Sequence, residues 1–379
     1  MYKDLQSFVA ALEAAGELVR VREEVDPVLE IAAIADRASK ARAPGEPSAS
    51  AKRNDPLAWG FGGPALLFER VKGSDFPVLI NAWGSYRRME MALGCQGRAS
   101  GHRGIGASRG EERGGFEAIA RRIGELVKPQ PPRSLSEVWE RGKQLLPLLK
   151  IAPRTVKQGR CQEVVLTGEA VDLTRLPILR CWPHDGDYAA LGYPAGVNDG
   201  VPGLGHPEID AGGGDRWERE FRGRYITLAG IHTIHADDAG KPRPASHNVG
   251  MYRVQLLGKD RVAMHWHVHH DGAAHWRSWK AKGERMPVAI ALGGEAVLPY
   301  AATCPLPPGI SELLMAGFLN GRGIEMVPCK TVPLRAPAHA EIVIEGWVSA
   351  GAGGVGWDPR DGGEPLGLDA AFEGPFGDH

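Results

Sequence analysis

The segment NVGMYRVQLLGKDRVAMHWHVH, residues 248 to 269, contains two short runs of strand-forming residues. The turn residues Gly258, Lys259 and Asp260 separate the two runs. Apolar and β-branched residues in short runs on either side of a turn are typical of strands. This segment therefore predicts β-structure in the middle of the chain.

Similar short runs occur elsewhere in the second half of the chain, again separated by turn residues. The predicted strands are Glu163–Leu166, Tyr225–Leu228, Asn248–Leu257, Arg261–His269 and Val288–Leu292. Many short strands between turns are typical of an antiparallel barrel or sandwich. A long segment rich in Gly, Pro and Asp, Trp182 to Gly214, has the composition of a lid or an insertion.

The first 130 residues predict a small α/β domain. Asp4 caps a first helix that Gly16 ends, and Asp26 with Pro27 has the form of the start of a second helix. The other predictions are strands at Ala65–Phe68 and Phe76–Ile80, a helix at Phe116–Lys128, and loops at Ala41–Pro56 and Gly94–Gly115. Further along, the sequence predicts a helix from Pro308 to Gly321.

Composition limits the class of protein. A formal net charge of -1 over 379 residues argues against a nucleic-acid scaffold, which needs a basic excess. The five cysteines are scattered and include no Cys-x-x-Cys pair, so a reducing cytoplasm is expected. The N-terminus has no signal-peptide core, and no apolar stretch is long enough to span a membrane.

The histidines of the quoted segment predict a metal site. On a strand, His265, His267 and His269 would share one face, and neutral imidazoles are common metal ligands. The alternative is that some of them are half-buried polar positions. A metal-dependent hydrolase is one function that such a strand suggests, although the chain has no His-Glu-x-x-His helix.

Further ligands would have to come from other segments. Asn248 begins a predicted strand, and Glu312 lies in the first turn of the predicted helix. A set of Asn, His and Glu suits manganese or magnesium better than zinc. Taken alone, Glu312 has the position of an acid that interacts with the helix dipole.

Arg253 is either a snorkelling surface residue or a binder of a carboxylate. A regular strand would put Arg253 and Asn248 on opposite faces, so a bulge at Gly250 is needed to bring them to one site. At the end of the chain, Glu373 and Asp378 are either solvated charges or an acid and a base.

Four motifs in order resemble those of the UbiD family of decarboxylases. They are Asn248–Arg253, Met264–His269, Pro308–Glu312 and Glu373–His379. The resemblance implies an α+β fold in three parts: an N-terminal α/β domain (1–130), a split β-barrel resembling flavin reductases (131–345), and the start of a C-terminal α/β domain (346–379). Family members continue past the last motif, so the chain is expected to be truncated. The segment from Asp187 to Arg222 exceeds the family pattern.

By the same resemblance, one histidine replaces the three-His face, and the metal ligands are Asn248, His269 and Glu312. The catalytic residues are Arg253, Glu373 and Asp378, with Asp378 as the proton donor. The residues expected to hold the prenylated flavin are Met251, Tyr252, Arg253, His265, Trp266, His267, His270 and Asp271.

The implied activity is the reversible, non-oxidative decarboxylation of an aromatic or α,β-unsaturated acid, with a polyprenylated hydroxybenzoate of ubiquinone biosynthesis as the default substrate. The implied cofactors are prenylated FMN, Mn²⁺ or another divalent metal, and K⁺. A flavin prenyltransferase would supply the cofactor to a cytoplasmic homo-oligomer. The alternatives are the hydrolase and a non-catalytic flavin- or metal-binding fragment.

Overall fold

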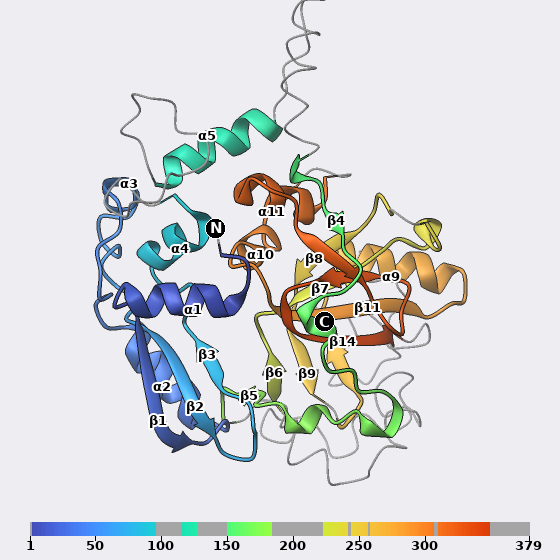
Figure 1. Cartoon of the computed structure of the whole chain (residues 1–379), viewed down its shortest axis with the longest axis horizontal. Coiled ribbons are helices and arrows are strands. Elements are labelled where there is room, and N and C mark those ends of the chain that lie inside the picture. The colour runs from blue at the N-terminus through green and yellow to red at the C-terminus, as the bar shows by residue number, and fades with distance from the viewer. Residues whose placement is uncertain are drawn as a thin grey trace, which may run out of the picture.

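The structure is a computed structural model that describes residues 2–95, 115–127, 150–183, 223–241, 244–256, 258–306 and 310–348. It has a mixed α/β fold in which a small N-terminal sheet lies beside a larger β-rich part (Figure 1). The predicted loop at Gly94–Gly115 and the segment Asp187–Arg222 lie almost wholly outside the described residues, as does the whole of Glu373–His379.

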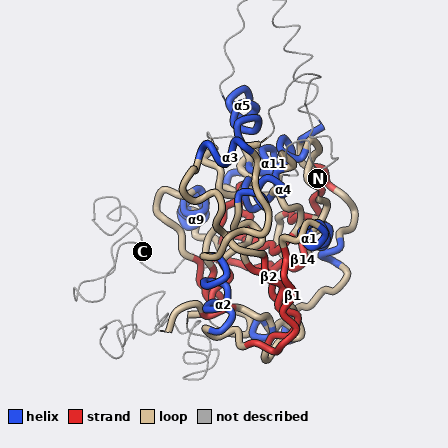
Figure 2. The backbone as a smooth tube through the Cα atoms, turned by 90° about the vertical axis from the view of Figure 1, so that its left-hand side faces the viewer, coloured by secondary structure: helices blue, strands red, loops and turns tan. Residues whose placement is uncertain are grey.

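The N-terminal sheet has the order β1-β2-β3, with β1 and β2 parallel and β3 antiparallel to β2. Helices lie along this sheet (Figure 2), and Phe8, Ile31 and Phe68 are fully buried between the layers. The strands are β1 (Leu18–Val25), β2 (Ala65–Val71) and β3 (Val78–Ile80), and the helices are α1 (Leu5–Ala14), α2 (Glu30–Ser39), α3 (Ala49–Asn54), α4 (Tyr86–Leu93) and α5 (Phe116–Val127).

The helix starts show where local sequence rules held. Asp4 caps α1 as predicted, because its carboxylate accepts a hydrogen bond from Ser7 N at 2.8 Å. The predicted start at Asp26 and Pro27 is wrong, since α2 begins at Glu30. Pro27 O instead accepts from Arg180 N, and Leu29 N donates to Arg180 O, so this segment binds β5 (Leu179–Arg180).

Two four-stranded antiparallel sheets form most of the β-rich part. Their orders are β10-β9-β6-β5 and β14-β11-β7-β8, and a third sheet has the order β13-β12-β4. The strands are β4 (Arg154–Thr155), β6 (Arg224–Ile226), β7 (Gly230–Thr233), β8 (Asn248–Met251), β9 (Val254–Leu256), β10 (Val262–Met264), β11 (Met286–Gly293), β12 (Glu325–Pro328), β13 (Arg335–Pro337) and β14 (Ala340–Val348).

The two larger sheets share one core. Ile226 and Val254 of one sheet pack with Ile231 and Ile290 of the other, and all four are at most 6% exposed. The alternation of buried and outward residues on short strands produces this packing. The strands of the described residues do not close into a barrel, and the sheets remain separate.

Several predicted boundaries are wrong, each for a local reason. Glu163–Leu166 is not a strand: it follows a 3₁₀ turn, no strand pairs with it, and Val164 is 75% exposed. The predicted loop Ala41–Pro56 contains α3, because Ser48 caps a helix there. Asn248–Leu257 divides into β8 and β9, since Tyr252 and Arg253 leave the sheet.

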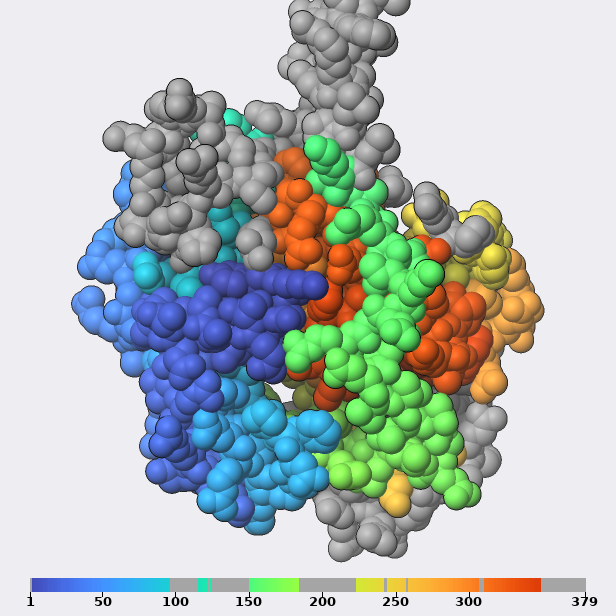
Figure 3. Space-filling view, in the orientation of Figure 1, coloured from blue at the N-terminus to red at the C-terminus, as the bar shows by residue number. Residues whose placement is uncertain are grey.

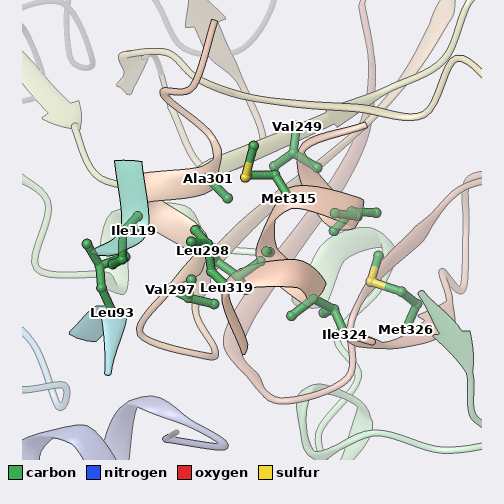
Figure 4. Packing of buried hydrophobic residues seen from close by; sticks show 12 residues of the cluster. Leu93, Ile119, Val249, Val297, Leu298, Ala301, Met315, Leu319, Ile324 and Met326 are labelled. Atoms are coloured by element: carbon green, nitrogen blue, oxygen red, sulfur yellow. The ribbon is translucent and has the colours of Figure 1, made fainter. Parts of the chain in front are cut away.

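Three helices complete the β-rich part: α9 (Asp271–Ala281), α10 (Leu298–Ala301) and α11 (Glu312–Asn320). The prediction of a helix from Pro308 is wrong at its start, because Ser311 is the N-cap of α11. Figure 4 shows the core beneath α10 and α11, where Leu93 and Ile119 of the N-terminal part join Val249 of β8. Among the described helices, none is long and apolar enough to cross a bilayer.

A buried ion pair holds the N-terminal part together. Arg88 of α4 and Glu17 have fully buried side chains, and Arg88 Nη1 lies 3.1 Å from Glu17 Oε2. The guanidinium also donates to the carbonyls of Gly62 and Gly63. Burial lowers the pKa of Arg88, while Glu17 opposes that shift.

Removing one member of this pair should be strongly destabilising. Arg88→Met leaves the buried Glu17 carboxylate with Arg87 as its remaining cation, at 3.1 Å from Nε to Oε1, so we expect the free energy of unfolding to fall by about 3 kcal/mol in chemical denaturation. The double variant Arg88→Met/Glu17→Gln should recover part of this loss. The control Arg20→Met removes an ion pair with Glu13 that is 36% and 46% exposed, and it should change stability by about 1 kcal/mol or less. Equal losses for Arg88→Met and Arg20→Met would contradict the role of burial.

Candidate functional site

The start of α11 is tied to β8 by one carboxylate. Glu312 is 8% exposed, and its Oε2 accepts a hydrogen bond from Val249 N at 2.9 Å. Ser311, the N-cap, donates from its hydroxyl to His247 O at 2.8 Å. These two contacts hold the start of α11 against β8 and place Glu312 at the backbone of the residue that follows Asn248 (α11 and β8, Figure 1).

The pKa of Glu312 is raised to about 6. Burial is the largest cause and the nearby Asp271 adds to it, while the hydrogen bond from Val249 N acts in the opposite direction. A buried carboxylate close to a second acid is a site that favours a cation. Glu312 therefore has more than the helix-dipole role that its position alone suggested.

Asn248 lies at the opposite end of β8 from the break in the strand. Its side chain is 7% exposed, and its polar interaction with the Tyr252 phenol lowers the pKa of that group against the larger effect of burial, although the buried Nδ2 atom makes no hydrogen bond of ordinary geometry. An amide has nearly the same shape in both orientations, so this end of the side chain can present its oxygen to a cation. An orphaned amide next to a buried acid fits a metal site.

After Met251 the chain leaves the sheet of β8 and continues as β9 in the neighbouring sheet. The Tyr252 ring folds over Gly250, where an added Cβ would lie 2.2 Å from its hydroxyl oxygen, so only glycine fits there. The predicted bulge at Gly250 is wrong, because β8 pairs regularly with β7 from Asn248 to Met251. The departure from regularity falls at Tyr252 and Arg253 instead.

The histidine-rich segment is not a strand. β10 ends at Met264, which pairs with Val254, the first residue of β9. Beyond that point, His267 N donates to His270 Nδ1 at 3.1 Å, and His269 N donates to His267 Nδ1 at 3.2 Å. Imidazoles that accept from nearby backbone groups stabilise a turn and compete with the sheet. The predicted one-faced ladder of His265, His267 and His269 is therefore wrong.

The imidazole rings form a chain that leads to Tyr252. The His270 ring lies 5.2 Å from the Tyr252 ring, and the His267 ring lies 5.4 Å from that of His270. His269 is exposed and stacks on His267 at 5.1 Å. No group of three His, Cys, Asp or Glu side chains in the described part of the chain could hold a metal ion, and the predicted set of Asn248, His269 and Glu312 is not such a group, because one of its members is an asparagine.

The remaining predicted cofactor residues lie around Tyr252. Gly272 packs between Tyr252 and Trp266, where an added Cβ would meet Trp266 Nε1 at 3.0 Å. Trp266 Nε1 is buried without a hydrogen-bond partner. Asp271 begins α9, and its charge raises the pKa of Tyr252 after the larger effect of burial.

Three predicted residues lie away from this group. The Met251 side chain lines a cavity, with Val249, on the face of β8 opposite Asn248. Arg253 is exposed, and its guanidinium lies 5.8 Å from the Tyr225 ring. The backbone N of His265 donates to Arg253 O at 3.3 Å. Glu373 and Asp378 lie outside the described residues.

The sequence reasoning missed a set of buried histidines next to β8. His232 Nδ1 lies 3.1 Å from His247 Nε2, and Thr233 Oγ1 lies 2.9 Å from His275 Nδ1. Burial lowers the pKa of His247 and of His275 to about 4. The only signal in the sequence was the position of His247 directly before Asn248.

Comparison with known proteins identifies the family of the chain. Residues 154–195 and 216–379 match the 3-octaprenyl-4-hydroxybenzoate carboxy-lyase Rift-related domain of UbiD, and residues 9–105 match its N-terminal domain. The chain belongs to the UbiD family. An uncharacterized protein of Aquifex aeolicus is 37% identical to it over 380 residues, which cover all of this chain and 58% of that protein.

Solved structures of UbiD-class proteins share the fold. The closed form of vanillic acid decarboxylase from Sedimentibacter hydroxybenzoicus superposes with a TM-score of 0.61 at 23% identity, covering 92% of this chain and 55% of the other. HmfF from Pelotomaculum thermopropionicum, in complex with FMN, gives 0.56 at 24% identity, covering 94% and 58%. The chain thus spans just over half the length of these UbiD relatives.

The titration of Glu312 should be visible in the stability of the metal-free protein. Its folded-state pKa of about 6 exceeds the ordinary value of 4.5, so its contribution is complete below pH 4.5 and is lost as pH rises through 6. We expect this group to lower the free energy of unfolding by about 2 kcal/mol between pH 4.5 and pH 7.5.

The variant Glu312→Gln cannot ionise and should lack this component when both proteins are unfolded in urea at the two pH values. Identical pH dependence in the wild type and the variant would show that the carboxyl titrates at its ordinary pKa.

Proposed function

We propose that the chain provides the metal- and flavin-binding part of a decarboxylase that acts on an aromatic or α,β-unsaturated carboxylic acid. Family membership supports this proposal, together with one observation in the structure. At the junction of β8 and α11, the buried Glu312 carboxylate accepts a hydrogen bond from Val249 N, one residue along the strand from Asn248, whose buried Nδ2 has no hydrogen-bond partner. This proposal covers prenylated FMN as the cofactor and a divalent metal, with Mn²⁺ as the expected ion and K⁺ as an additional one.

The donor chemistry of the site fits a hard divalent cation. Asn248 and Glu312 offer oxygen atoms, and His269 offers an exposed imidazole. Manganese and magnesium prefer such oxygen-rich sets, and manganese also accepts imidazole. In this proposal the cation lies between these three side chains, and the pKa of Glu312 falls when it binds.

The neighbouring residues fit a planar cofactor with a phosphate group. Tyr252 and Trp266 are in edge contact at 6.2 Å, and the Trp266 Nε1 hydrogen has no acceptor. The side chains proposed to surround the flavin are Met251, Tyr252, Arg253, His265, Trp266, His267, His270 and Asp271. The assignment of Met251 to this set has the least structural support, because its side chain lies on the face of β8 opposite Asn248.

Decarboxylation leaves a carbanion, and a prenylated flavin, when bound, supplies the electron sink for it. The chain's own residues have other tasks. Arg253 is proposed to hold the substrate carboxylate, because a guanidinium binds a carboxylate with two parallel hydrogen bonds. Glu373 is proposed to lie near Arg253, whose positive charge favours the ionised carboxylate. Asp378 is proposed to return a proton to carbon after CO₂ leaves.

The substrate class follows from the names of similar proteins. The solved relatives include decarboxylases of vanillic acid and of 3,4-dihydroxybenzoic acid. We propose an aromatic acid first, with a polyprenylated hydroxybenzoate of ubiquinone biosynthesis as a specific candidate. A flavin prenyltransferase as cofactor supplier, a homo-oligomer and a cytoplasmic location belong to the same proposal.

The hydrolase alternative loses its main support. It required three histidines on one strand face, and the segment is a turn with its rings bonded to local backbone groups. The other alternative, a fragment that binds cofactor without catalysis, is tested by separate measurements of binding and of CO₂ release.

Metal binding can be tested without any flavin. We expect Mn²⁺ titration followed by electron paramagnetic resonance to give a 10- to 100-fold lower affinity for Asn248→Ala and for Glu312→Gln. The matched control is Asn320→Ala, a change of another buried asparagine without side-chain hydrogen bonds. If both asparagine variants bind Mn²⁺ as the wild type does, the metal site is not at Asn248.

Activity can be tested after co-expression with a flavin prenyltransferase. We expect a flavin absorbance spectrum and CO₂ release from one member of a panel of aromatic and acrylic acids. Glu373→Gln should lower CO₂ release by about 10²- to 10⁴-fold while the flavin stays bound, and Arg253→Ala should lower CO₂ release by at least as much and also weaken flavin binding.

The control for Arg253 is Arg285→Ala, because the Arg285 guanidinium also lies 5.8 Å from an aromatic ring, that of Trp347. Bound flavin without CO₂ release from any acid would favour the non-catalytic fragment. Absence of bound flavin would reject the proposal.

A further inference from the structure

A cavity of about 440 Å³ lies between the N-terminal part and the two larger sheets. Its walls are mostly apolar and include Leu5, Val9, Leu67, Trp83, Ile178 and Val249. Figure 3 shows an opening between the blue-to-cyan N-terminal part and the green segment, residues 150–183. This volume is within the range of small-molecule sites.

The cavity is separate from the candidate metal site. Val249 lines the cavity and pairs across the sheet with His232, which also lines it. Asn248 is the next residue on β8, so its side chain points to the other face. A molecule in the cavity would therefore lie behind the strand that carries Asn248.

One end of the cavity holds a buried carboxyl with an unsatisfied oxygen. Glu295 is 1% exposed and lines the cavity, and its Oε1 has no hydrogen-bond partner. The nearest cation, Arg322 Nη2, lies 3.5 Å away. An unmatched buried oxygen is costly, and a hydroxyl donor from a ligand would satisfy it.

His232 offers a second polar atom at the cavity wall. Its Nδ1 is paired with His247, and its Nε2 lies next to Gly230, where an added Cβ would be 3.7 Å from it. Burial holds the pKa of His232 well below its ordinary value, so the ring is neutral and can exchange one hydrogen bond with an uncharged group.

The mouth of the cavity is apolar but carries negative charge. Phe76 and Leu228 line it and are 42% and 45% exposed, which is unusual for such large apolar side chains. Glu341 also lines it and accepts a hydrogen bond from Gln6 of α1 at 3.4 Å. Arg253, the proposed binder of the substrate carboxylate, is not among the lining residues.

We propose that this cavity is a second ligand site, which takes an uncharged apolar molecule with one hydroxyl group, such as an alkylphenol. The apolar walls bind the hydrocarbon body, and the hydroxyl lies at Glu295 and His232. An ionised acid is disfavoured, because Glu341 would repel it, as would the ionised form of Glu295, whose pKa burial raises to about 7. Of the residues proposed to surround the flavin, Met251 is the one that lines this cavity, and ligand binding here does not require the proposed decarboxylase activity.

The test uses the full chain without added flavin or metal, so a failure of the decarboxylase proposal does not affect it. The probes are 4-hexylphenol and 4-hexylbenzoate, which differ only in the polar group, and binding is measured by isothermal titration calorimetry. We expect saturable binding of one 4-hexylphenol per chain, at least tenfold tighter than the benzoate. No saturable binding of the phenol, or equal affinity for both probes, would overturn the proposal.

Two variants locate the binding. Thr227 lies on the exposed part of the lining, so Thr227→Trp should fill the cavity without disturbing the core and weaken phenol binding at least tenfold. The control Thr167→Trp places the same side chain at an exposed threonine outside the cavity, and its affinity should stay within twofold of wild type. Undiminished binding by a folded Thr227→Trp protein would show that the phenol binds elsewhere.

Glu295→Gln tests the polar end of the cavity. Loss of the charge should reduce the ratio of the benzoate Kd to the phenol Kd at least fivefold. Thermal unfolding checks that the variant is folded. An unchanged preference would reject Glu295 as the group that selects against acids. If this variant does not fold, Thr227→Trp still tests the position of the site.

Discussion

The hydrogen bond from Val249 N to the Glu312 carboxylate is the contact on which the candidate site depends. It joins a helix start to a strand that are far apart in the sequence, and it fills the buried space beside Asn248 with an acid. A buried carboxylate is unfavourable unless a cation or a proton compensates it. The same contact that fixes the geometry thus creates a demand for positive charge at this point.

The site is held in place by elements on both sides of β8. On one side, Tyr252, Gly272 and His270 pack around the strand end, and α9 begins there. On the other side, Val249 belongs to the core that α10 and α11 share with Leu93 and Ile119 of the N-terminal part. The N-terminal part also meets β5 through the backbone bonds at Pro27 and Leu29. Strain or motion in the N-terminal part would therefore reach β8 through packed residues.

The sequence predicted features that depend on local chemistry. The Asp4 cap and the strand around Ala65–Phe68 are of this kind. Prediction from the sequence failed where residues far away in the chain determine the boundary of a helix or strand. Arg180 takes the carbonyl of Pro27, so α2 starts later, and β9 starts only at Val254, so β10 loses its partner at Met264. The pairing of His232 with His247 follows from the register of β7 and β8, which composition and spacing do not contain.

The position of the Tyr252 ring over Gly250 has a consequence for how this segment can evolve. Any side chain at residue 250 would occupy the space of the ring, so a substitution there is acceptable only in a chain that has already lost the aromatic group at residue 252. The reverse order is less restricted, because a smaller residue at 252 leaves room without creating a clash. The two positions are therefore epistatic, and the path between Gly–Tyr and any other pair has a preferred first step.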